Sequence, residues 1–115
     1  MIKGIGTDII EVKRIQAAID RWGDQFLNHV FNKEEIEYAQ KNKNPTQHFA
    51  ARFAAKEAVY KAFSKENITW KDITILNDKF GKPYCEINKK KSKVKVLISI
   101  SHTENYAVAN AIITS

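Results

Sequence analysis

The sequence is poor in the features that build secreted or membrane-spanning domains. It has a single cysteine, Cys85, among 115 residues, so neither an intrachain disulfide nor a zinc site made of several cysteines can hold the fold together. It has no apolar run near the length of about 20 residues that a membrane-spanning helix needs. The first residues also lack the apolar segment and small-residue cleavage site of a secretory signal. We therefore expect a cytoplasmic protein with no membrane partner.

Proline and glycine are also scarce. The chain has two prolines and four glycines, and no stretch has the composition of a linker, a repeat or a low-complexity segment. Hydrophobic residues make up 43% of the sequence and charged residues 28%, which is typical of a globular chain. The length suits one modest hydrophobic core. We expect a single domain over residues 1–115.

Positive charge is in excess. Nineteen Lys and Arg against 13 Asp and Glu give a net charge of +6, which favours a polyanionic partner but does not distinguish nucleic acid, nucleotide and acidic protein. The densest run, Lys89–Lys95, is compatible with a small RNA-binding domain. That run lies between two strand-like stretches, so we interpret it as a solvent-exposed turn. We expect no nucleic-acid partner.

Residue periodicity predicts the elements of the N-terminal half. A strand is expected from Ile2 to Ile10, with Asp8 on the face opposite Ile5 and Ile9. A first amphipathic helix should follow and end at Gly23. Its buried stripe is expected to comprise Val12, Ile15, Ile19 and Trp22. The apolar residues between Phe26 and Phe31 should add to the core.

Two further helices have clear start signals. Asn32, with Glu35 three residues later, resembles a capping box for a short acidic helix through about Gln40. Asn44 and Pro45 supply an N-cap and a first-turn proline for the longest helix, which we expect to run to about residue 64. Its many alanines favour a helix that packs closely against a sheet.

The C-terminal half reads as strands. The stretches Ile73–Leu76 and Tyr84–Ile87 flank turn-forming residues and predict a hairpin. Alternation from Val94 to Ser101, and an apolar stretch from Tyr106 to Ile113, predict two more strands. We expect these strands to form an antiparallel meander. The predicted fold class is α+β, with a small antiparallel sheet packed against one long helix and shorter helices.

The first glycines do not form a dinucleotide-binding motif. Gly4 and Gly6 match its first two glycines, but Ile9 stands where the third should be. The charged residues of the long helix stand out more. Arg52 and Lys56 are four apart, as are Glu57 and Lys61, and on residue spacing alone these are equally well ordinary surface pairs.

His102 lies at the end of the strand that contains Ser99 and Ser101. Hydroxyls, an imidazole and exposed backbone N–H groups at the end of a strand could bind phosphate. A histidine beside a turn is more often an ordinary surface residue. The residues alone leave both interpretations open.

Four stretches together resemble one known family. In chain order they are Gly4–Ile15, Phe49–Ala58, Gly81–Pro83 and Ser99–Thr103. Their order and the chain length are similar to those of holo-acyl-carrier-protein synthases, small single-domain members of the 4′-phosphopantetheinyl transferase superfamily. The resemblance implies an enzyme of that fold. It would transfer 4′-phosphopantetheine from coenzyme A to a serine of apo acyl carrier protein, for fatty acid synthesis, and release adenosine 3′,5′-bisphosphate.

The resemblance also implies roles for individual residues. Asp8 and Glu57 would hold Mg²⁺, which prefers hard oxygen ligands together with waters and substrate phosphates. The catalytic residues would be Glu57, Lys61 and His102, with Lys61 neutralising the leaving phosphate. The serine proton would go to Glu57 or to a water on the metal, and the sequence does not rank the two. The implied coenzyme A site comprises Arg52, Lys61, Gly81, Lys82, Pro83, Ser101 and His102.

The resemblance extends to partners. It implies that Arg14 on the first helix docks the acidic acyl carrier protein. Arg21, seven residues on, shares the same polar helix face, so we expect it to contribute to docking. The resemblance also implies a homotrimer with active sites between neighbouring subunits. An inactive relative that only binds the carrier is the alternative, and the intact set of charged site residues argues against it. One departure is Phe63–Asn67, where many relatives have a glycine-rich turn, so we expect the helix exit and the pantetheine pocket to differ.

Overall fold

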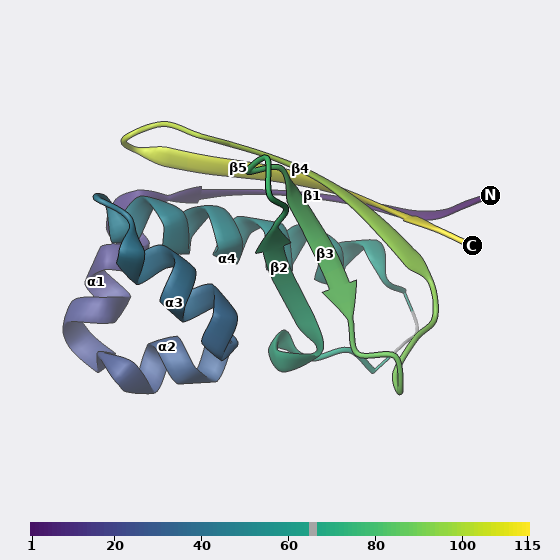
Figure 1. Cartoon of the computed structure of the whole chain (residues 1–115), viewed down its shortest axis with the longest axis horizontal. Coiled ribbons are helices and arrows are strands. Elements are labelled where there is room, and N and C mark those ends of the chain that lie inside the picture. Colours follow the sequence, from purple (N-terminus) through teal and green to yellow (C-terminus); the bar gives the residue numbers. More distant parts are fainter. Residues whose placement is uncertain (65–66) are drawn as a thin grey trace.

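The computed structural model describes residues 1–64 and 67–115. A long central helix separates two sheets (Figure 1), and three shorter helices pack beside the smaller sheet. The strands are β1 (Ile2–Glu11), β2 (Ile73–Asn77), β3 (Pro83–Ile87), β4 (Lys95–His102) and β5 (Tyr106–Thr114). The helices are α1 (Val12–Trp22), α2 (Asp24–Val30), α3 (Lys33–Lys41), α4 (Pro45–Ala62) and the short 3₁₀ helix η1 (Trp70–Asp72). This architecture confirms the predicted α+β class.

The strands form two separate antiparallel sheets. One has the order β1-β5-β4, and the other consists of β2 and β3. The predicted hairpin Ile73–Ile87 is therefore confirmed, whereas the prediction of one meander is wrong. Within the described residues, no strand pairing joins β3 to β4, although the two strands lie next to each other and line one cavity. The N-terminal strand β1 instead pairs along the whole of β5.

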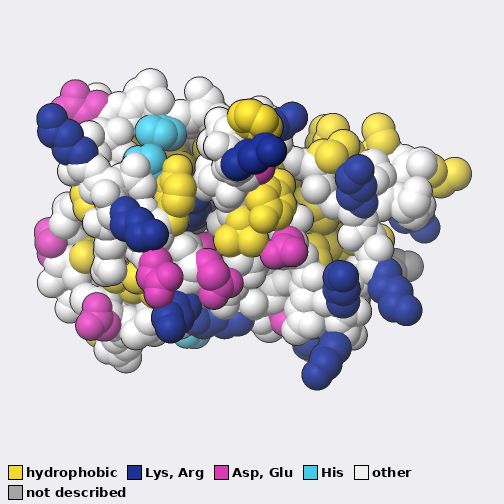
Figure 2. Space-filling model, in the orientation of Figure 1, with side chains coloured by type: hydrophobic (Ala, Val, Ile, Leu, Met, Phe, Trp, Pro, Cys, Tyr) yellow, Lys and Arg dark blue, Asp and Glu magenta, His cyan; other side chains and the backbone are white. Residues whose placement is uncertain are grey.

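The lysine-rich segment between β3 and β4 is a turn. Lys91 N–H donates to the Asn88 carbonyl at 2.8 Å, and the lysines at 89, 90, 91 and 93 are exposed. Figure 2 shows basic side chains projecting at the lower right, where this turn lies, while basic and acidic side chains alternate over the helices. The interpretation of the run as a solvent-exposed turn is confirmed.

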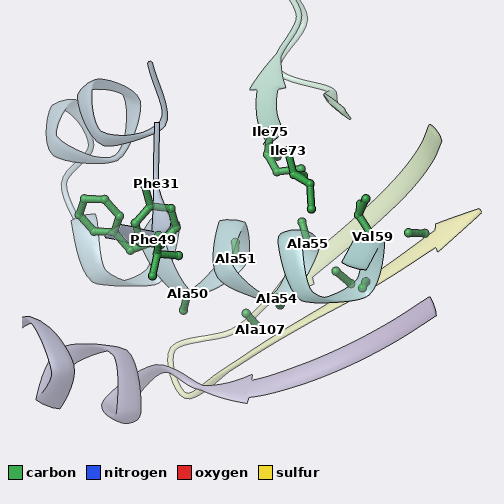
Figure 3. Close-up of a cluster of buried hydrophobic side chains, with 14 of the residues drawn as sticks. Phe31, Phe49, Ala50, Ala51, Ala54, Ala55, Val59, Ile73, Ile75 and Ala107 are labelled. Carbon is green, nitrogen blue, oxygen red and sulfur yellow. The ribbon is translucent and has the colours of Figure 1, made fainter. Parts of the chain in front are cut away.

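Small residues on α4 let both sheets pack closely on it. Ala54, Ala55 and Ala58 are fully buried. Figure 3 shows Ile73 and Ile75 of β2 on one side of α4 and Ala107 of β5 on the other. A helix that is buried on two sides has no single apolar stripe, which is why alanine content predicted its environment better than periodicity did.

Strand β1 makes the closest approach to α4. A Cβ atom added at Gly6 would lie 2.9 Å from the Ala62 nitrogen and still closer to the Ala58 carbonyl oxygen. A Cβ added at Gly4 would overlap the Ala62 carbonyl group. Because strand residues alternate between faces, the residues flanking the glycines point outward, and Ile5 is 72% exposed. Asp8 shares the inward face with Gly6, so it is directed toward α4.

Two local expectations about the helices are wrong, whereas the core role expected of residues 26 to 31 is confirmed. Trp22 is 52% exposed rather than part of the buried stripe, because it lies at the last turn of α1 beneath the Arg21 guanidinium, 5.0 Å from its ring centroid. The side chain of Asn44 makes no capping hydrogen bond, so α4 starts on its proline alone. The apolar residues predicted as core between positions 26 and 31 belong mostly to a helix, α2, that the sequence did not predict.

The close approach makes a stability prediction. Gly6→Ala should lower the free energy of unfolding by about 3 kcal/mol, the upper end of common overpacking costs, because the atoms that must move belong to the α4 backbone. Urea denaturation followed by circular dichroism measures this. Lys3→Ala, on the exposed face of the same strand, should change stability by less than about 0.5 kcal/mol. Equal effects of the two substitutions would contradict the packing described.

Candidate active site

Two carboxylates and a lysine meet where β1 crosses α4. Lys61 Nζ donates to Asp8 Oδ1 at 3.1 Å and to the Thr7 carbonyl at 3.2 Å. Glu57 lies one helical turn before Lys61 on the same face of α4. Burial raises the pKa of Glu57, the nearby charge of Asp8 raises it further, and Lys61 acts in the opposite direction. We call Asp8, Glu57 and Lys61 the carboxylate cluster.

The carboxylate cluster fits a divalent cation of the magnesium type. The side chain of Asp8 is 14% exposed, and its charge acts on Glu57 strongly enough to raise that residue's pKa. Two negative groups brought together in this way favour a cation between them. Among the described residues, no three His, Cys, Asp or Glu side chains gather into a metal site. Mg²⁺ commonly takes one or two carboxylates and completes its shell with water and substrate phosphate.

A second cluster lies on the other side of α4. It surrounds a pocket of about 200 Å³, which we call the Arg52 pocket. Its walls come from α3, α4, the β2–β3 hairpin and the end of β4: Tyr38, His48, Ala51, Arg52, Asn77, Gly81, Pro83, Ile100 and His102.

Arg52 is the central cation of this pocket. It is only 3% exposed, and its guanidinium carbon lies 4.0 Å from the centroid of the Tyr38 ring. One of its terminal nitrogens donates to Asn77 Oδ1, while its Nε has no hydrogen-bond partner among the described residues. Burial lowers the Arg52 pKa, and Tyr38 and Glu35 partly offset this. A buried cation with an unused donor beside an open pocket suits an anionic ligand.

Two histidines share the pocket with Arg52. The rings of His48 and His102 are 5.6 Å apart at their centroids. Burial lowers the pKa of His48, and the charges of Arg52 and His102 lower it further. The lowered pKa favours the neutral form of His48 beside the Arg52 guanidinium. Sequence reasoning missed His48, although its spacing of four from Arg52 places both on one helix face.

Only some of the residues predicted to bind coenzyme A line the Arg52 pocket. Gly81 and Pro83 line the Arg52 pocket together with Arg52 and His102, whereas Lys82 is exposed beside it. Ser101 pairs with Val108 on β5 and points to the face of the sheet opposite His102.

Lys61 belongs to the carboxylate cluster and not to the pocket. Arg52 and Lys61 are nine residues apart on α4, which corresponds to a rotation of about 180° and a rise of about 13.5 Å. One chain therefore presents these two cations on opposite sides of the helix.

The other predicted residues lie outside both clusters. Arg14 and Arg21 are exposed on α1. Lys56, whose role the sequence left open, is fully buried in an ion pair with Glu35. Tyr38 and Asn77 were missed by sequence reasoning because neither carries a recognisable motif. In the divergent segment Phe63–Asn67, Phe63 is half-buried, while positions 65 and 66 lie outside the described residues.

The fold and these clusters have counterparts among known proteins. The family model described as the 4′-phosphopantetheinyl transferase superfamily matches residues 4–111. The chain belongs to this superfamily. It is 49% identical over 122 residues to the holo-[acyl-carrier-protein] synthase of Protochlamydia amoebophila, covering 100% of both chains. It is 47% identical to the holo-[acyl-carrier-protein] synthase of Thermodesulfovibrio yellowstonii, covering 99% of this chain and 100% of the relative.

A solved structure supports the same assignment. The holo-(acyl-carrier-protein) synthase of Bacillus anthracis, crystallised in complex with CoA (3′,5′-ADP), has a TM-score of 0.83 and 36% identity. The match covers 98% of this chain and 96% of that one. The family predicted from four sequence stretches, and the enzyme class that goes with it, are thereby confirmed. The expectation of a single domain over residues 1–115 stays a prediction.

Proposed function

We propose that this chain transfers the 4′-phosphopantetheine group of coenzyme A to a serine hydroxyl of apo acyl carrier protein. The products are holo acyl carrier protein, for fatty acid synthesis, and adenosine 3′,5′-bisphosphate. The observation that carries this proposal is the combination of an anion-binding pocket around Arg52 with a pair of carboxylates suited to Mg²⁺. A relative of similar fold was crystallised with CoA (3′,5′-ADP). No described helix is long and apolar enough to span a bilayer, and a cytoplasmic location belongs to the same proposal.

The Arg52 pocket is the proposed site for the nucleotide end of coenzyme A. Arg52 and His102 supply hydrogen-bond donors for phosphate oxygens, and Lys82 is exposed beside the pocket, whereas Ser101 points to the opposite face of β4. The backbone of the turn Gly81–Pro83 forms the wall that approaches the nucleotide. A cation held by burial and by Asn77 needs no reorganisation when the phosphates arrive, which favours binding.

The proposed reaction occurs at the carboxylate cluster. The serine oxygen forms a bond to the phosphorus that carries pantetheine. The bond between that phosphorus and the bridging oxygen of the diphosphate breaks, and its electron pair leaves with adenosine 3′,5′-bisphosphate. Lys61 neutralises the charge that builds on the leaving phosphate, and His102 contacts the phosphates. The serine proton passes to Glu57 or to a water beside it.

Asp8 and Glu57 are the proposed holders of Mg²⁺. When bound, this ion supplies positive charge against the diphosphate. The side chains would hold it from two different elements, β1 and α4. The contact of Lys61 with Asp8 supports a role for this lysine next to the proposed metal ligands.

We also propose that the active enzyme is a homotrimer with shared sites. The outer face of the larger sheet carries a row in which Ile5 of β1 and Leu97 of β4 both pair with Ile112 of β5. Ile5 is 72% exposed and Leu97 50% exposed, which favours burial against another copy. Arg52 and Lys61 lie on opposite sides of α4 and about 13.5 Å apart along its axis. A head-to-tail ring could bring the pocket of one copy to the carboxylates of the next.

The metal assignment predicts a loss of transfer without a loss of folding. Intact-mass spectrometry of apo carrier protein, incubated with the chain, coenzyme A and Mg²⁺, should show the gain of one phosphopantetheine group. Asp8→Asn and Glu57→Gln should each slow this gain by about a hundredfold, because each removes a ligand charge. Glu86→Gln, an exposed carboxylate on β3, is the matched control. Near-normal turnover of either site variant at low Mg²⁺ would refute the metal site.

The proposed assembly predicts a defined mass in solution. Light scattering at micromolar concentration should give about three times the chain mass of 13.2 kDa. Ile5→Asp should lower this mass and activity together, because it places a charge in the apolar row. A monomer with full activity would show that each chain carries a complete site.

Carrier docking is proposed for the exposed basic face of α1. Arg14 and Arg21 are seven residues apart and share that face, and both are exposed. An acidic carrier would be attracted mainly during encounter, so exposed charges should act on the association rate.

Reversing one of these charges separates docking from chemistry. Arg14→Glu should raise the KM for the carrier about tenfold and flatten its salt dependence, with little change in coenzyme A binding by calorimetry. Lys89→Glu in the β3–β4 turn is the control of equal charge change. An unchanged carrier KM in Arg14→Glu, or an equal loss of coenzyme A affinity, would move the docking face elsewhere, first to Arg21, Lys41 and Lys43.

A further inference from the structure

One buried carboxylate joins three elements outside both clusters. Glu35 and Lys56 have no exposed side-chain surface, and Lys56 Nζ donates to Glu35 Oε1 at 2.7 Å. The same oxygen accepts the Asn32 backbone N–H at 2.7 Å, and Oε2 accepts the Ile75 backbone N–H at 2.8 Å. Glu35 therefore connects the start of α3, the middle of α4 and the centre of β2.

Stability alone is a weak reason for this ion pair. Removing two charges from water is costly, and replacing a buried ion pair by apolar residues of similar size is often neutral or stabilising. The surroundings are apolar, since the Lys56 ammonium lies 5.7 Å from the centroid of the buried Phe31 ring. Burial lowers the pKa of Lys56, and Glu35 raises it in part. An apolar pair would fill this space, but it would not bond to the N–H of Ile75.

The Glu35–Lys56 pair lies next to the Arg52 pocket along both α4 and β2. On α4, Arg52 precedes Lys56 by one helical turn. On β2, Asn77 follows Ile75 by two residues, so their side chains share a strand face. Asn77 accepts a hydrogen bond from Arg52 and donates to the Gly81 carbonyl at 2.9 Å. Helix α4 and strand β2 are thus joined twice, first at Glu35 and then at the pocket.

A third contact strengthens the same connection. The Asn32 amide donates to Thr74 Oγ1 at 2.8 Å and to the Ile73 carbonyl at 3.2 Å. The start of α3 is therefore hydrogen-bonded to β2 through both Asn32 and Glu35. Helix α3 also carries Tyr38, which covers the Arg52 guanidinium. The contacts of Asn32, Glu35 and Lys56 therefore join α3, α4 and the β2–β3 hairpin, which form all the pocket walls except β4.

We propose that Glu35 and Lys56 are a pair of positioning residues that fix the β2–β3 hairpin on α4 in the register at which Asn77 meets Arg52. The pair thereby preforms the pocket for the nucleotide end of coenzyme A. This inference rests on the proposed function for the identity of that ligand. Neither residue touches substrate, so each acts through Arg52 and Asn77. The expected signature is weaker coenzyme A binding with carrier recognition unchanged.

The test uses a charge-free pair of similar shape. In the variant Glu35→Gln with Lys56→Met, the calorimetric Kd and the KM for coenzyme A should rise about tenfold, while the KM for the carrier changes less than twofold. Ile113→Ala, which removes buried contacts on β5 across α4 from Glu35, is the control for lost stability. A purely structural role predicts that coenzyme A affinity follows stability equally in both variants, and that result would overturn the proposal.

A double-mutant cycle tests the route through Asn77. Lys56→Met should weaken coenzyme A binding about tenfold in the otherwise unchanged chain, but less than twofold in an Asn77→Ala background, because the contact it positions is already lost. Additive effects would overturn the proposal. If Lys56→Met alone unfolds the chain because Glu35 is left unpaired, the cycle uses the double variant Glu35→Gln with Lys56→Met in place of Lys56→Met. Calorimetry with 3′,5′-ADP gives the same comparison without turnover. A chain that fails to modify the carrier would refute the proposed function, whereas the binding measurements would still test this inference.

Discussion

The contact between β1 and α4 is the constraint on which the rest of the structure depends. Gly4 and Gly6 lie so close to the backbone at Ala58 and Ala62 that no side chain fits between them. This approach brings the strand carrying Asp8 against the helix carrying the other two members of the carboxylate cluster. It also places β1 beside β5, which completes the larger sheet. Two glycines and two alanines thus determine where the carboxylate cluster forms.

The same helix has to bury positive charge on its other side. Arg52 and Lys56 are both buried, although each would cost several kcal/mol if left without a partner. The structure offsets that cost in two different ways. Lys56 forms an ion pair with the Glu35 carboxylate. Arg52 has only a hydrogen bond to the amide oxygen of Asn77 and a contact with the face of the Tyr38 ring. The incomplete neutralisation of Arg52 is what makes its pocket attractive to an anion, while the complete neutralisation at Lys56 suits a structural joint.

Local signals explain what the sequence could predict. The start of α3, the end of α1 at Gly23 and the β2–β3 turn depend on residues within a few positions of one another, and all three were predicted. The family, and the residues of the carboxylate cluster, followed from short stretches in the right order. The separation into two sheets, the exposure of Trp22 and the partner of Lys56 could not be predicted in this way. Each depends on contacts between distant segments, such as the 21 positions that separate Glu35 from Lys56.

Helix geometry also relates the proposed assembly to the chemistry. Residues on opposite sides of α4 cannot reach one small group, because the helix with its side chains is about 10 Å across. In the proposed reaction, the diphosphate of coenzyme A meets Lys61 while its nucleotide end meets Arg52. Within one chain, Arg52 and Lys61 lie on opposite sides of α4 and about 13.5 Å apart along its axis. In a head-to-tail ring the cofactor needs only to cross a subunit boundary. The same packing that brings Asp8 to α4 leaves Arg52 on the other side of the helix, and this separation is the physical reason for proposing that the reaction uses sites shared between copies.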